Sequence, residues 1–186
     1  NIAKQWGLDT EFIDNSITLT NWEVKTPDIV QIPSEMSLYP MAILLDNLHE
    51  KLQVEVETQD IDELLLDTLE VLENPDITKV NLRDGSDVIT PAAALMAISD
   101  GGEIIGASHT KGKETDRIIR TCELLEKFSL DCIPKSDGLI LPGGSYPTKP
   151  ESPIETHMDH RLAMTAVILA TYCGAEIINT EIIKVT

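Results

Sequence analysis

Residues 79–141 read KVNLRDGSDVITPAAALMAISDGGEIIGASHTKGKETDRIIRTCELLEKFSLDCIPKSDGLIL, and their pattern indicates the fold class. Short β-branched runs alternate here with two longer stretches whose apolar residues recur at helical spacing. The order is strand-helix-strand-helix-strand-strand, a βαβαββ unit. Thr90 and Pro91 are expected to be the N-cap and first-turn residue of the first helix. The predicted elements are strands 77–82, 103–107, 130–133 and 138–141, and helices 90–99 and 115–128.

The same order of elements recurs on both sides of this unit. Residues 28–82 follow it up to the fifth element, with a helix at 36–48, and residues 154–178 open a further copy with a helix at 161–172. We therefore predict an α/β fold of repeated βαβαββ units, preceded by a short hairpin at residues 11–19. In each copy an acid stands just before the first helix, and these acids are Glu35, Asp87 and Asp159.

The charge balance excludes several classes of partner. The chain has 32 acidic and 14 basic residues, a formal net charge of −18. Phosphate backbones and anionic membranes attract basic proteins, so we expect neither nucleic acid nor membrane as a partner. Small anions would bind only where the few Lys and Arg side chains are concentrated. No apolar run approaches the roughly 18 residues of a transmembrane helix.

The cysteines Cys122, Cys132 and Cys173 are an odd number without a CxxC spacing. We therefore expect neither a disulfide framework nor a zinc site, and we expect a reducing cytoplasm. The chain begins at Asn1 without a methionine and ends on residues 184–186 (KVT), so we expect a processed or cut chain.

Asp87 closes the segment DGSD, residues 84–87, just before a predicted helix. An acid at this position can accept hydrogen bonds from hydroxyl groups or remove a proton. The commoner interpretation is a turn acid that stabilises the helix N-terminus by charge and capping. Both interpretations remain open from this segment alone.

Residues 109–117 (HTKGKETDR) concentrate positive charge in a chain that is otherwise acidic. A helix beginning near Glu114 would place Lys113 at its N-terminus, where backbone N–H groups favour an anion. It would also place Glu114 and Arg117 on one face. The alternative interpretation is a solvated helix start with a Glu114–Arg117 ion pair.

Residues 159–164 (DHRLAM) open a further predicted helix. Arg161 offers a planar, two-pronged donor to a carboxylate or phosphate, and Asp159 is positioned to hold it. His160 can transfer protons near neutral pH. Such a triplet also occurs by chance. Two isolated histidines are interpreted as surface or structural residues, His49 and His157.

Together, residues 113–117 (KETDR) and 159–164 (DHRLAM) resemble the KETDR and DHRMAM signatures of the EPSP synthase (3-phosphoshikimate 1-carboxyvinyltransferase) family. Asp87, followed by an Ala-rich helix and Gly101, resembles the family's catalytic aspartate segment in spacing. Residues 32–39 (IPSEMSLY) loosely resemble its GDxSSASY stretch. The resemblance implies two similar domains, each of three βαβαββ units, with the active site between them.

The resemblance covers residues 28–186 and implies that they form the C-terminal domain of this two-domain fold, incomplete at its C-terminus. Residues 1–27 would be left over from the other domain. The implied reaction transfers the enolpyruvyl group of phosphoenolpyruvate to the 5-hydroxyl of shikimate 3-phosphate and releases phosphate. It is a cytoplasmic step of the shikimate pathway to aromatic amino acids. The implied partners are these two substrates and the missing N-terminal domain, so the chain alone is expected to be inactive. No cofactor and no metal are implied.

The resemblance also implies roles for single residues. The catalytic groups would be Asp87 as base on the attacking oxygen, Glu114 as proton donor and acceptor at the methylene carbon, and His160 beside it. The shikimate 3-phosphate ligands would be Asp87, His109 and Lys113. The phosphoenolpyruvate ligands would be Arg117, Arg161 and Lys184, with Asp159 in support. The addition delivers a proton to carbon while an oxygen loses one, so at least two titratable groups are needed. Fixed cations would hold the anionic substrate and offset charge as phosphate leaves.

Three positions depart from the family pattern. His109 stands where the family has Asn, and Gly112 replaces an apolar residue. The family carries a Lys immediately before a Thr near the end, whereas Val185 precedes Thr186 here. Lys184 substitutes for that Lys only if the loop is one residue shorter.

Two other classes of function remain open. One is the related enolpyruvyl transferase that acts on a UDP-linked sugar; it uses a different acid set and a reactive Cys, and the KETDR and DHRLAM segments speak against it. The other is a binding domain of the same fold that has lost catalysis. An active site requires the functional side chains to converge on one face, namely Asp87, Lys113, Glu114, Arg117, His160 and Arg161.

Overall fold

The computed structural model describes residues 12–13, 16–17, 23, 25, 36–49, 74 and 78–185. The chain divides into two compact units, residues 1–33 and 34–186. In the first unit, β1 (Phe12–Ile13) pairs antiparallel with β2 (Ser16–Ile17), which confirms the predicted hairpin. Within the predicted copy at residues 28–82, residues 28–35 (with Glu35), 50–73 and 75–77 lie outside the described residues.

A four-stranded mixed sheet forms one layer of the second unit. Helix α4 (Ile89–Ile98) connects its first two strands, and helix α5 (Arg117–Lys127) leads to the last pair. The first two strands are parallel and the other contacts are antiparallel. This is the predicted βαβαββ unit. In spatial order the strands are β3 (Lys79–Asn81), β4 (Gly102–Ile105), β6 (Gly138–Leu141) and β5 (Ile133–Lys135).

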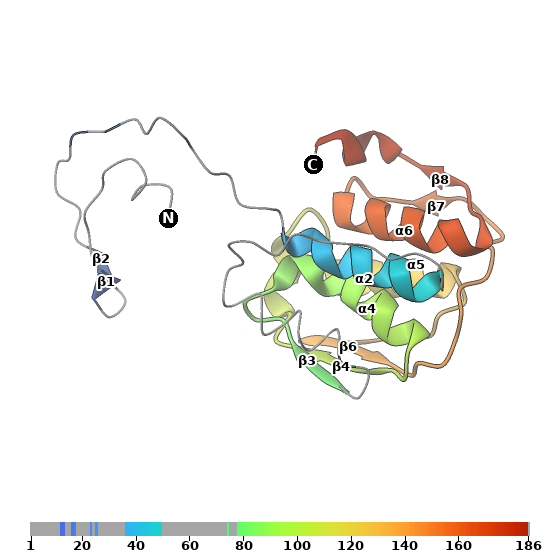
Figure 1. Cartoon of the computed structure of the whole chain (residues 1–186), viewed down its shortest axis with the longest axis horizontal. Coiled ribbons are helices and arrows are strands. Elements are labelled where there is room, and N and C mark those ends of the chain that lie inside the picture. The colour runs from blue at the N-terminus through green and yellow to red at the C-terminus, as the bar shows by residue number, and fades with distance from the viewer. Residues whose placement is uncertain are drawn as a thin grey trace. The chain divides into compact units, whose positions relative to one another are not determined.

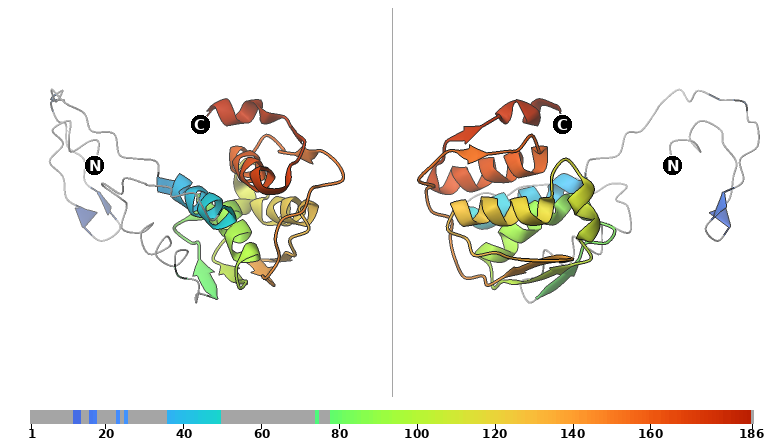
Figure 2. Two further views of the ribbon diagram at one scale, coloured as in Figure 1. Left: turned by 45° about the vertical axis from the view of Figure 1, so that its right-hand side comes forward. Right: turned by 180° about the vertical axis from the view of Figure 1, so that it is seen from behind.

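Apolar and charged side chains alternate along the strands, and this pattern decides which face of the sheet is buried. Val80 and Ile104 are paired neighbours and both are buried. Lys79 and Glu103, one residue earlier in each strand, form an exposed ion pair with 2.9 Å between Nζ and Oε2. Figures 1 and 2 show the described helices on one side of this sheet. The core therefore lies between that face and the helices.

Helix α4 is the centre of the core, and all ten of its residues are buried. It contacts strands β4 and β6 and three helices, namely α2 (Tyr39–Leu48), α5 and α6 (His160–Cys173). Residues 92–94 are all alanine, and small side chains let neighbouring helices approach closely. The predicted helices 36–48 and 161–172 are confirmed by α2, with the 3₁₀ turn η1 (Met36–Leu38) before it, and by α6.

The prediction that Thr90 caps α4 is wrong. The helix begins at Ile89, directly after the 3₁₀ turn η2 (Ser86–Val88), and Thr90 lies inside it. Thr90 is fully buried, and its hydroxyl oxygen lies 3.0 Å from that of Thr121 in α5. Burial rather than capping therefore explains the hydroxyl, which finds its partner on the neighbouring helix.

Helix α5 begins two residues later than predicted. Asp116 is its N-cap and accepts a hydrogen bond from the backbone N–H of Ile119 at 3.3 Å. Lys113 and Glu114 precede the helix, so the prediction that Lys113 stands at its N-terminus is wrong. The predicted pairing of Glu114 with Arg117 is nevertheless present.

The cysteine prediction also needs a correction. Cys122 of α5 and Cys132, just before β5, form a disulfide, while Cys173 is free. The expectation rested on number and spacing, but α5 packs on β5 and brings two buried cysteines together from ten residues apart. The cysteines therefore no longer support a reducing compartment.

A second, two-stranded sheet follows the βαβαββ unit. β7 (Ile154–Glu155) and β8 (Ile177–Ile178) are parallel, and α6 connects them. This confirms the prediction that a further copy opens at residue 154. The 3₁₀ turn η4 (Thr180–Val185) packs on α6. None of the helices in the described part of the chain has the length and hydrophobicity needed to cross a bilayer.

We expect Met158→Gly to stabilise the protein. Met158 has a φ of 58°, and a positive φ costs a residue with a side chain roughly 1–2 kcal/mol, whereas glycine adopts it freely. Its side chain is 48% exposed, so little packing is lost. The freedom of glycine in the unfolded chain offsets roughly 0.4–1 kcal/mol. A net gain of about 0.5–1 kcal/mol should raise the melting temperature by about 1–4 °C.

The control is Met158→Ala, which shortens the side chain but keeps the strained backbone. Thermal unfolding of both variants separates the two effects. A rise in the alanine variant as large as in the glycine variant would show that the side chain, and not the backbone, limits stability at this position.

Candidate active site

Arg117, the first residue of α5, is the centre of a cluster of charged side chains. It is 1% exposed, and its guanidinium donates four hydrogen bonds to three carboxylates. Nε and Nη2 donate to the two oxygens of Asp159 at 2.9 and 3.3 Å. Nη1 donates to Asp87 Oδ1 and Nη2 to Glu114 Oε2, both at 2.8 Å. One arginine therefore joins three acids.

The three acids come from three strand-to-helix connections. Asp87 lies in η2, between β3 and α4, and Glu114 lies between β4 and α5. Asp159 lies between β7 and α6, where it is the N-cap of α6 and accepts a hydrogen bond from the backbone N–H of Arg161 at 2.9 Å. Connections that leave strands and enter helices are a common place for ligand-binding residues in α/β folds.

Asp159 and Arg117 form the buried part of the cluster. Burial alone raises the pKa of the fully buried Asp159, but the hydrogen bond and charge of Arg117 outweigh it and bring the pKa below its usual value. Thr115 also donates to Asp159 Oδ2, at 3.1 Å. Burial likewise lowers the pKa of Arg117, but the hydrogen bonds and charges of Asp159, Glu114 and Asp87 together outweigh it, so the net shift is upward. Both groups therefore stay charged.

The other members of the cluster form a partly exposed rim. The side chains of Asp87, Glu114 and His160 are 44%, 42% and 22% exposed. Lys113 Nζ lies 3.5 Å from Asp87 Oδ1, and His160 Nδ1 lies 3.5 Å from Glu114 Oε1. Burial raises the pKa of Asp87, but Arg117 and Lys113 lower it further, so the net shift is downward. Acids, a base and a cation thus lie together at the surface above a fixed charge pair.

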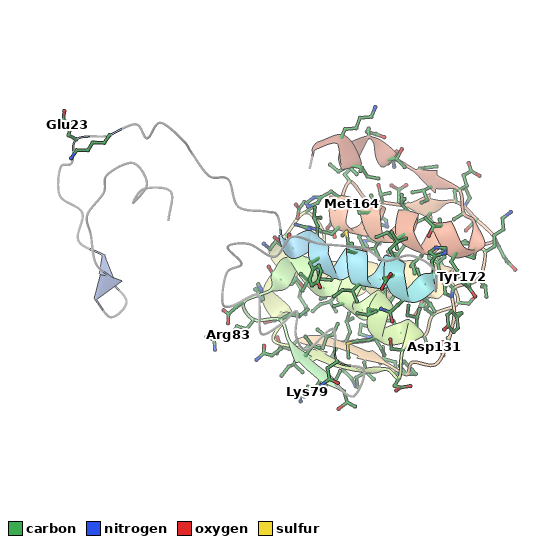
Figure 3. All side chains as sticks on the ribbon, in the orientation of Figure 1. Glu23, Lys79, Arg83, Asp131, Met164 and Tyr172 are labelled. Carbon is green, nitrogen blue, oxygen red and sulfur yellow. A yellow bond between two sulfur atoms is a disulfide. The ribbon has the colours of Figure 1, made fainter. Side chains whose placement is uncertain are left out.

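Arg161 lies beside the cluster but donates in another direction. Its guanidinium is 5% exposed and donates to Ser37 Oγ at 2.6 Å and to the Ser37 carbonyl at 3.3 Å. Its charge still helps to lower the pKa of Asp87. Figure 3 labels Met164 and Tyr172 near the two ends of α6, and Arg161 belongs to the Met164 end, where the helix begins. Arg161 therefore links α6 to η1.

The structure brings six of the predicted site residues into direct contact and places Arg161 next to them. In the described part of the chain, neither His109 nor Lys184 forms a hydrogen bond or ion pair with this group. His109 is exposed in the 3₁₀ turn η3 (Ser108–Gly112), and Lys184 is exposed in η4. The six in contact are Asp87, Lys113, Glu114, Arg117, Asp159 and His160.

Sequence reasoning missed Asp137, which supports the loop that carries Lys113 and Glu114. Its carboxylate accepts hydrogen bonds from the backbone N–H groups of Gly106 at 3.0 Å and Ser108 at 2.9 Å. Hydrogen bonds from Ser108 lower the pKa of Asp137 most. The sequence marks Asp137 only as a residue of the turn between β5 and β6, so no signal distinguished it.

Other surface features lack this concentration of chemistry. A groove between α5 and β7 is lined by both signs of charge, and these are already paired: Arg120 with Glu123 at 2.6 Å, and Lys127 with the Ser152 hydroxyl at 2.9 Å. Within the described ranges, no three His, Cys, Asp or Glu side chains are grouped so that they could hold a metal ion.

We expect Asp159→Asn to destabilise the protein strongly. Asparagine caps a helix as well as aspartate, so the α6 cap is kept while Arg117 loses its buried counter-charge. Removing one partner of a buried pair costs about 3–5 kcal/mol. Asp116→Asn is the matched control: it changes the same charge at the N-cap of α5 and should cost under about 0.5 kcal/mol. Urea unfolding measures both, and equal costs would contradict a structural role for the Arg117–Asp159 pair.

The lowered pKa values of Asp87 and Asp159 predict a loss of stability in acid. Their contribution is complete above the usual pKa of aspartate, about 3.9, and is lost as the pH falls through the lower folded-state pKa. The free energy of unfolding should therefore fall as the pH drops below about 4. Asp159→Asn should fall less steeply, since it lacks one of the two groups. Parallel curves for the two proteins would show that Asp159 does not titrate with folding.

Comparisons with known proteins show the family to which the chain belongs. A model of the EPSP synthase (3-phosphoshikimate 1-carboxyvinyltransferase) family matches residues 13–186. A 3-phosphoshikimate 1-carboxyvinyltransferase from Methanobrevibacter smithii is 34% identical over 108 residues, 58% of this chain and 24% of that protein. One from Clostridium beijerinckii is 36% identical over 104 residues, 54% of this chain and 24% of that protein.

A solved structure gives the same answer for the fold. The EPSP synthase from Acinetobacter baumannii superposes with a TM-score of 0.72 at 19% identity, covering 97% of this chain and 49% of that chain. The chain thus spans about a quarter of the curated relatives above and about half of this structure. Its mixed α/β fold corresponds to one domain of a two-domain protein. With the family model matching nearly all of its residues, the chain belongs to the EPSP synthase (3-phosphoshikimate 1-carboxyvinyltransferase) family.

Proposed function

We propose that this chain carries part of an active site that transfers the enolpyruvyl group of phosphoenolpyruvate to the 5-hydroxyl of shikimate 3-phosphate and releases phosphate. The observation that carries the proposal is the buried Arg117 fork beneath the accessible acids Asp87 and Glu114. The family membership supports the substrates, because relatives that match this chain are named for the reaction.

The rim acids suit the two proton transfers of this reaction. In the addition, the hydroxyl oxygen bonds to the central carbon of phosphoenolpyruvate and loses its proton, while the methylene carbon gains one. In the elimination, the methyl carbon loses a proton and phosphate leaves with the bonding electron pair. Asp87 would take the hydroxyl proton, and Glu114 would serve the carbon with His160 beside it. Lys113, paired with Asp87, would contact the same hydroxyl region.

Arg117 would bind the carboxylate or phosphate of phosphoenolpyruvate, since its planar fork suits both groups. Arg161 would assist, and its contact with Ser37 means that in this structure it acts on the site through charge. We extend the proposal to His109 as a shikimate 3-phosphate ligand and to Lys184 as a phosphoenolpyruvate ligand. Both rest on position in the sequence alone.

The proposed partner is the other domain of the enzyme. We assign residues 28–186 to the C-terminal domain and residues 1–27 to the remainder of the N-terminal one. Preorganised charges act strongly only where water is excluded, whereas the side chains of Asp87, Glu114 and His160 are partly exposed. The other domain would cover them. A cytoplasmic location is also part of the proposal, because phosphorylated substrates do not cross membranes freely. There the Cys122–Cys132 pair would be reduced.

Two alternatives are less well supported. The UDP-sugar relative uses a reactive Cys, but the free cysteine here, Cys173, has a pKa raised by burial and hence less thiolate. A binding domain without catalysis is favoured by two observations. Val185 stands where the family has Lys, and carboxylates of the chain itself already occupy Arg117.

Mixing this chain with a separately produced N-terminal domain of a related EPSP synthase tests the proposal. We expect the mixture to release phosphate only when both substrates are present, and the chain alone to be silent. Glu114→Gln should lower the rate by about 10²–10⁴-fold, the usual contribution of a general acid–base group. Glu123→Gln, which breaks the exposed pair with Arg120 on the same helix, should retain the rate.

Three outcomes would contradict the proposal. Phosphate release by the isolated chain at the rate of a whole enzyme would show that the second domain is not needed. A folded but inactive mixture would favour the binding domain. Full activity in Glu114→Gln would remove Glu114 from the chemistry.

A further inference from the structure

Carboxylates of the protein itself already occupy the guanidinium of Arg117. A two-pronged contact uses two parallel N–H groups, either Nε with Nη2 or Nη1 with Nη2. Both oxygens of Asp159 take the first pair. On the second pair, Nη1 donates to Asp87 and Nη2 to Glu114. Nη1 carries two N–H groups, and the bond to Asp87 takes one of them. An incoming carboxylate can therefore form a two-pronged contact with Nη1 and Nη2 once Glu114 leaves Nη2, or with Nε and Nη2 once Asp159 leaves.

Asp159 is the least able of the three to leave. It is fully buried, and it also accepts hydrogen bonds from the Thr115 hydroxyl and the backbone N–H of Arg161. Moving it would leave a buried charge on Arg117 without a partner. The Nε side of the fork is therefore a fixed part of the protein.

Glu114 has both the freedom and a second partner. Its side chain is 42% exposed, so water can replace the hydrogen bond that it gives up. Its other oxygen, Oε1, already lies 3.5 Å from His160 Nδ1. An ion pair between residues three apart, one of them exposed, contributes little to the free energy of folding. A two-pronged contact with the substrate can therefore replace the Glu114–Arg117 pair. A Glu114 released from Arg117 would move towards His160.

We propose that Glu114 is an internal ligand of Arg117, and that it occupies the place of the substrate carboxylate until the substrate displaces it. The inference rests on the proposed function and extends it to specificity. A substrate with a carboxylate takes the Nη1–Nη2 end of the fork and frees Glu114 for proton transfer beside His160. A phosphate ester without a carboxylate leaves Glu114 on Arg117 and is not turned over.

Oxalate binding to the full chain tests this without depending on the reaction. Oxalate is a planar carboxylate that cannot be an enolpyruvyl donor. The readout is the NMR signal of Arg117 Nε–Hε, assigned through its own backbone, during a titration. Glu114→Gln should tighten oxalate binding about three- to ten-fold, and Glu114→Ala, which removes the hydrogen bond altogether, should tighten it at least as much.

Glu123→Gln is the matched control. It removes one negative charge from the same helix, from an exposed pair that also spans three residues, Arg120 Nη1 to Glu123 Oε2 at 2.6 Å. Any gain in oxalate affinity that comes only from making the net charge less negative appears in this variant too. The proposal requires a clear excess of Glu114→Gln over Glu123→Gln.

Each outcome decides the matter. Equal or weaker oxalate binding in Glu114→Gln than in Glu123→Gln overturns the proposal, and so does an Arg117 signal that responds in none of the proteins. Tightening in Asp87→Asn but not in Glu114→Gln shows that Asp87 is the displaced acid and also overturns it. Tightening in Glu114→Gln supports it. If the wild-type mixture then transfers no enolpyruvyl group, the proposed reaction fails while the role of Glu114 on Arg117 stands.

Discussion

Arg117 and Asp159 meet beneath the surface, with 2.9 Å between Nε and Oδ2, where no water can replace either partner. Two charges taken out of water cost several kcal/mol each unless they find each other. The pair forms only if the start of α5 and the start of α6 lie side by side, and these helices belong to successive repeats of the fold. The need to pair these two charges thus holds the starts of α5 and α6 together. Asp87 and Glu114 in turn accept hydrogen bonds from the Arg117 that this pair fixes.

The exposure of the cluster changes sharply from its buried pair, Arg117 and Asp159, to its rim. Arg117 and Asp159 are held by packing and by several hydrogen bonds, whereas Asp87 and Glu114 have one side in solvent. A fixed pair preserves geometry, and an accessible rim lets groups change partners and exchange protons. This division suits the proposed function, because the side chains that would meet the substrate are also the ones that can rearrange.

Sequence reasoning identified the βαβαββ order because periodicity and Gly or Pro boundaries are local signals. Through two short motifs and Asp87 it also predicted six residues that the structure brings into contact. It failed where burial or long-range contact decides. The sequence predicts Thr90 as a helix cap, but Thr90 is buried against another helix, whereas Asp116, for which no capping role was predicted, caps α5. The bond between Arg161 and Ser37 joins residues 124 positions apart, and no local pattern reports it. The Cys122–Cys132 pair depends likewise on how α5 packs.

The turn between β5 and β6 has a consequence for how this protein can change. Asp137 is exposed there, and exposed turns usually tolerate substitution and insertion. Here its carboxylate and its carbonyl hold the backbone of residues 106–108, where the chain leaves β4 towards Lys113 and Glu114. A surface position far along the chain from either motif is therefore tied to the loop that delivers them. The sequence of this turn should therefore change over evolutionary time as slowly as that of the interior. A peptide inserted into the turn would disturb the position of Lys113 and Glu114.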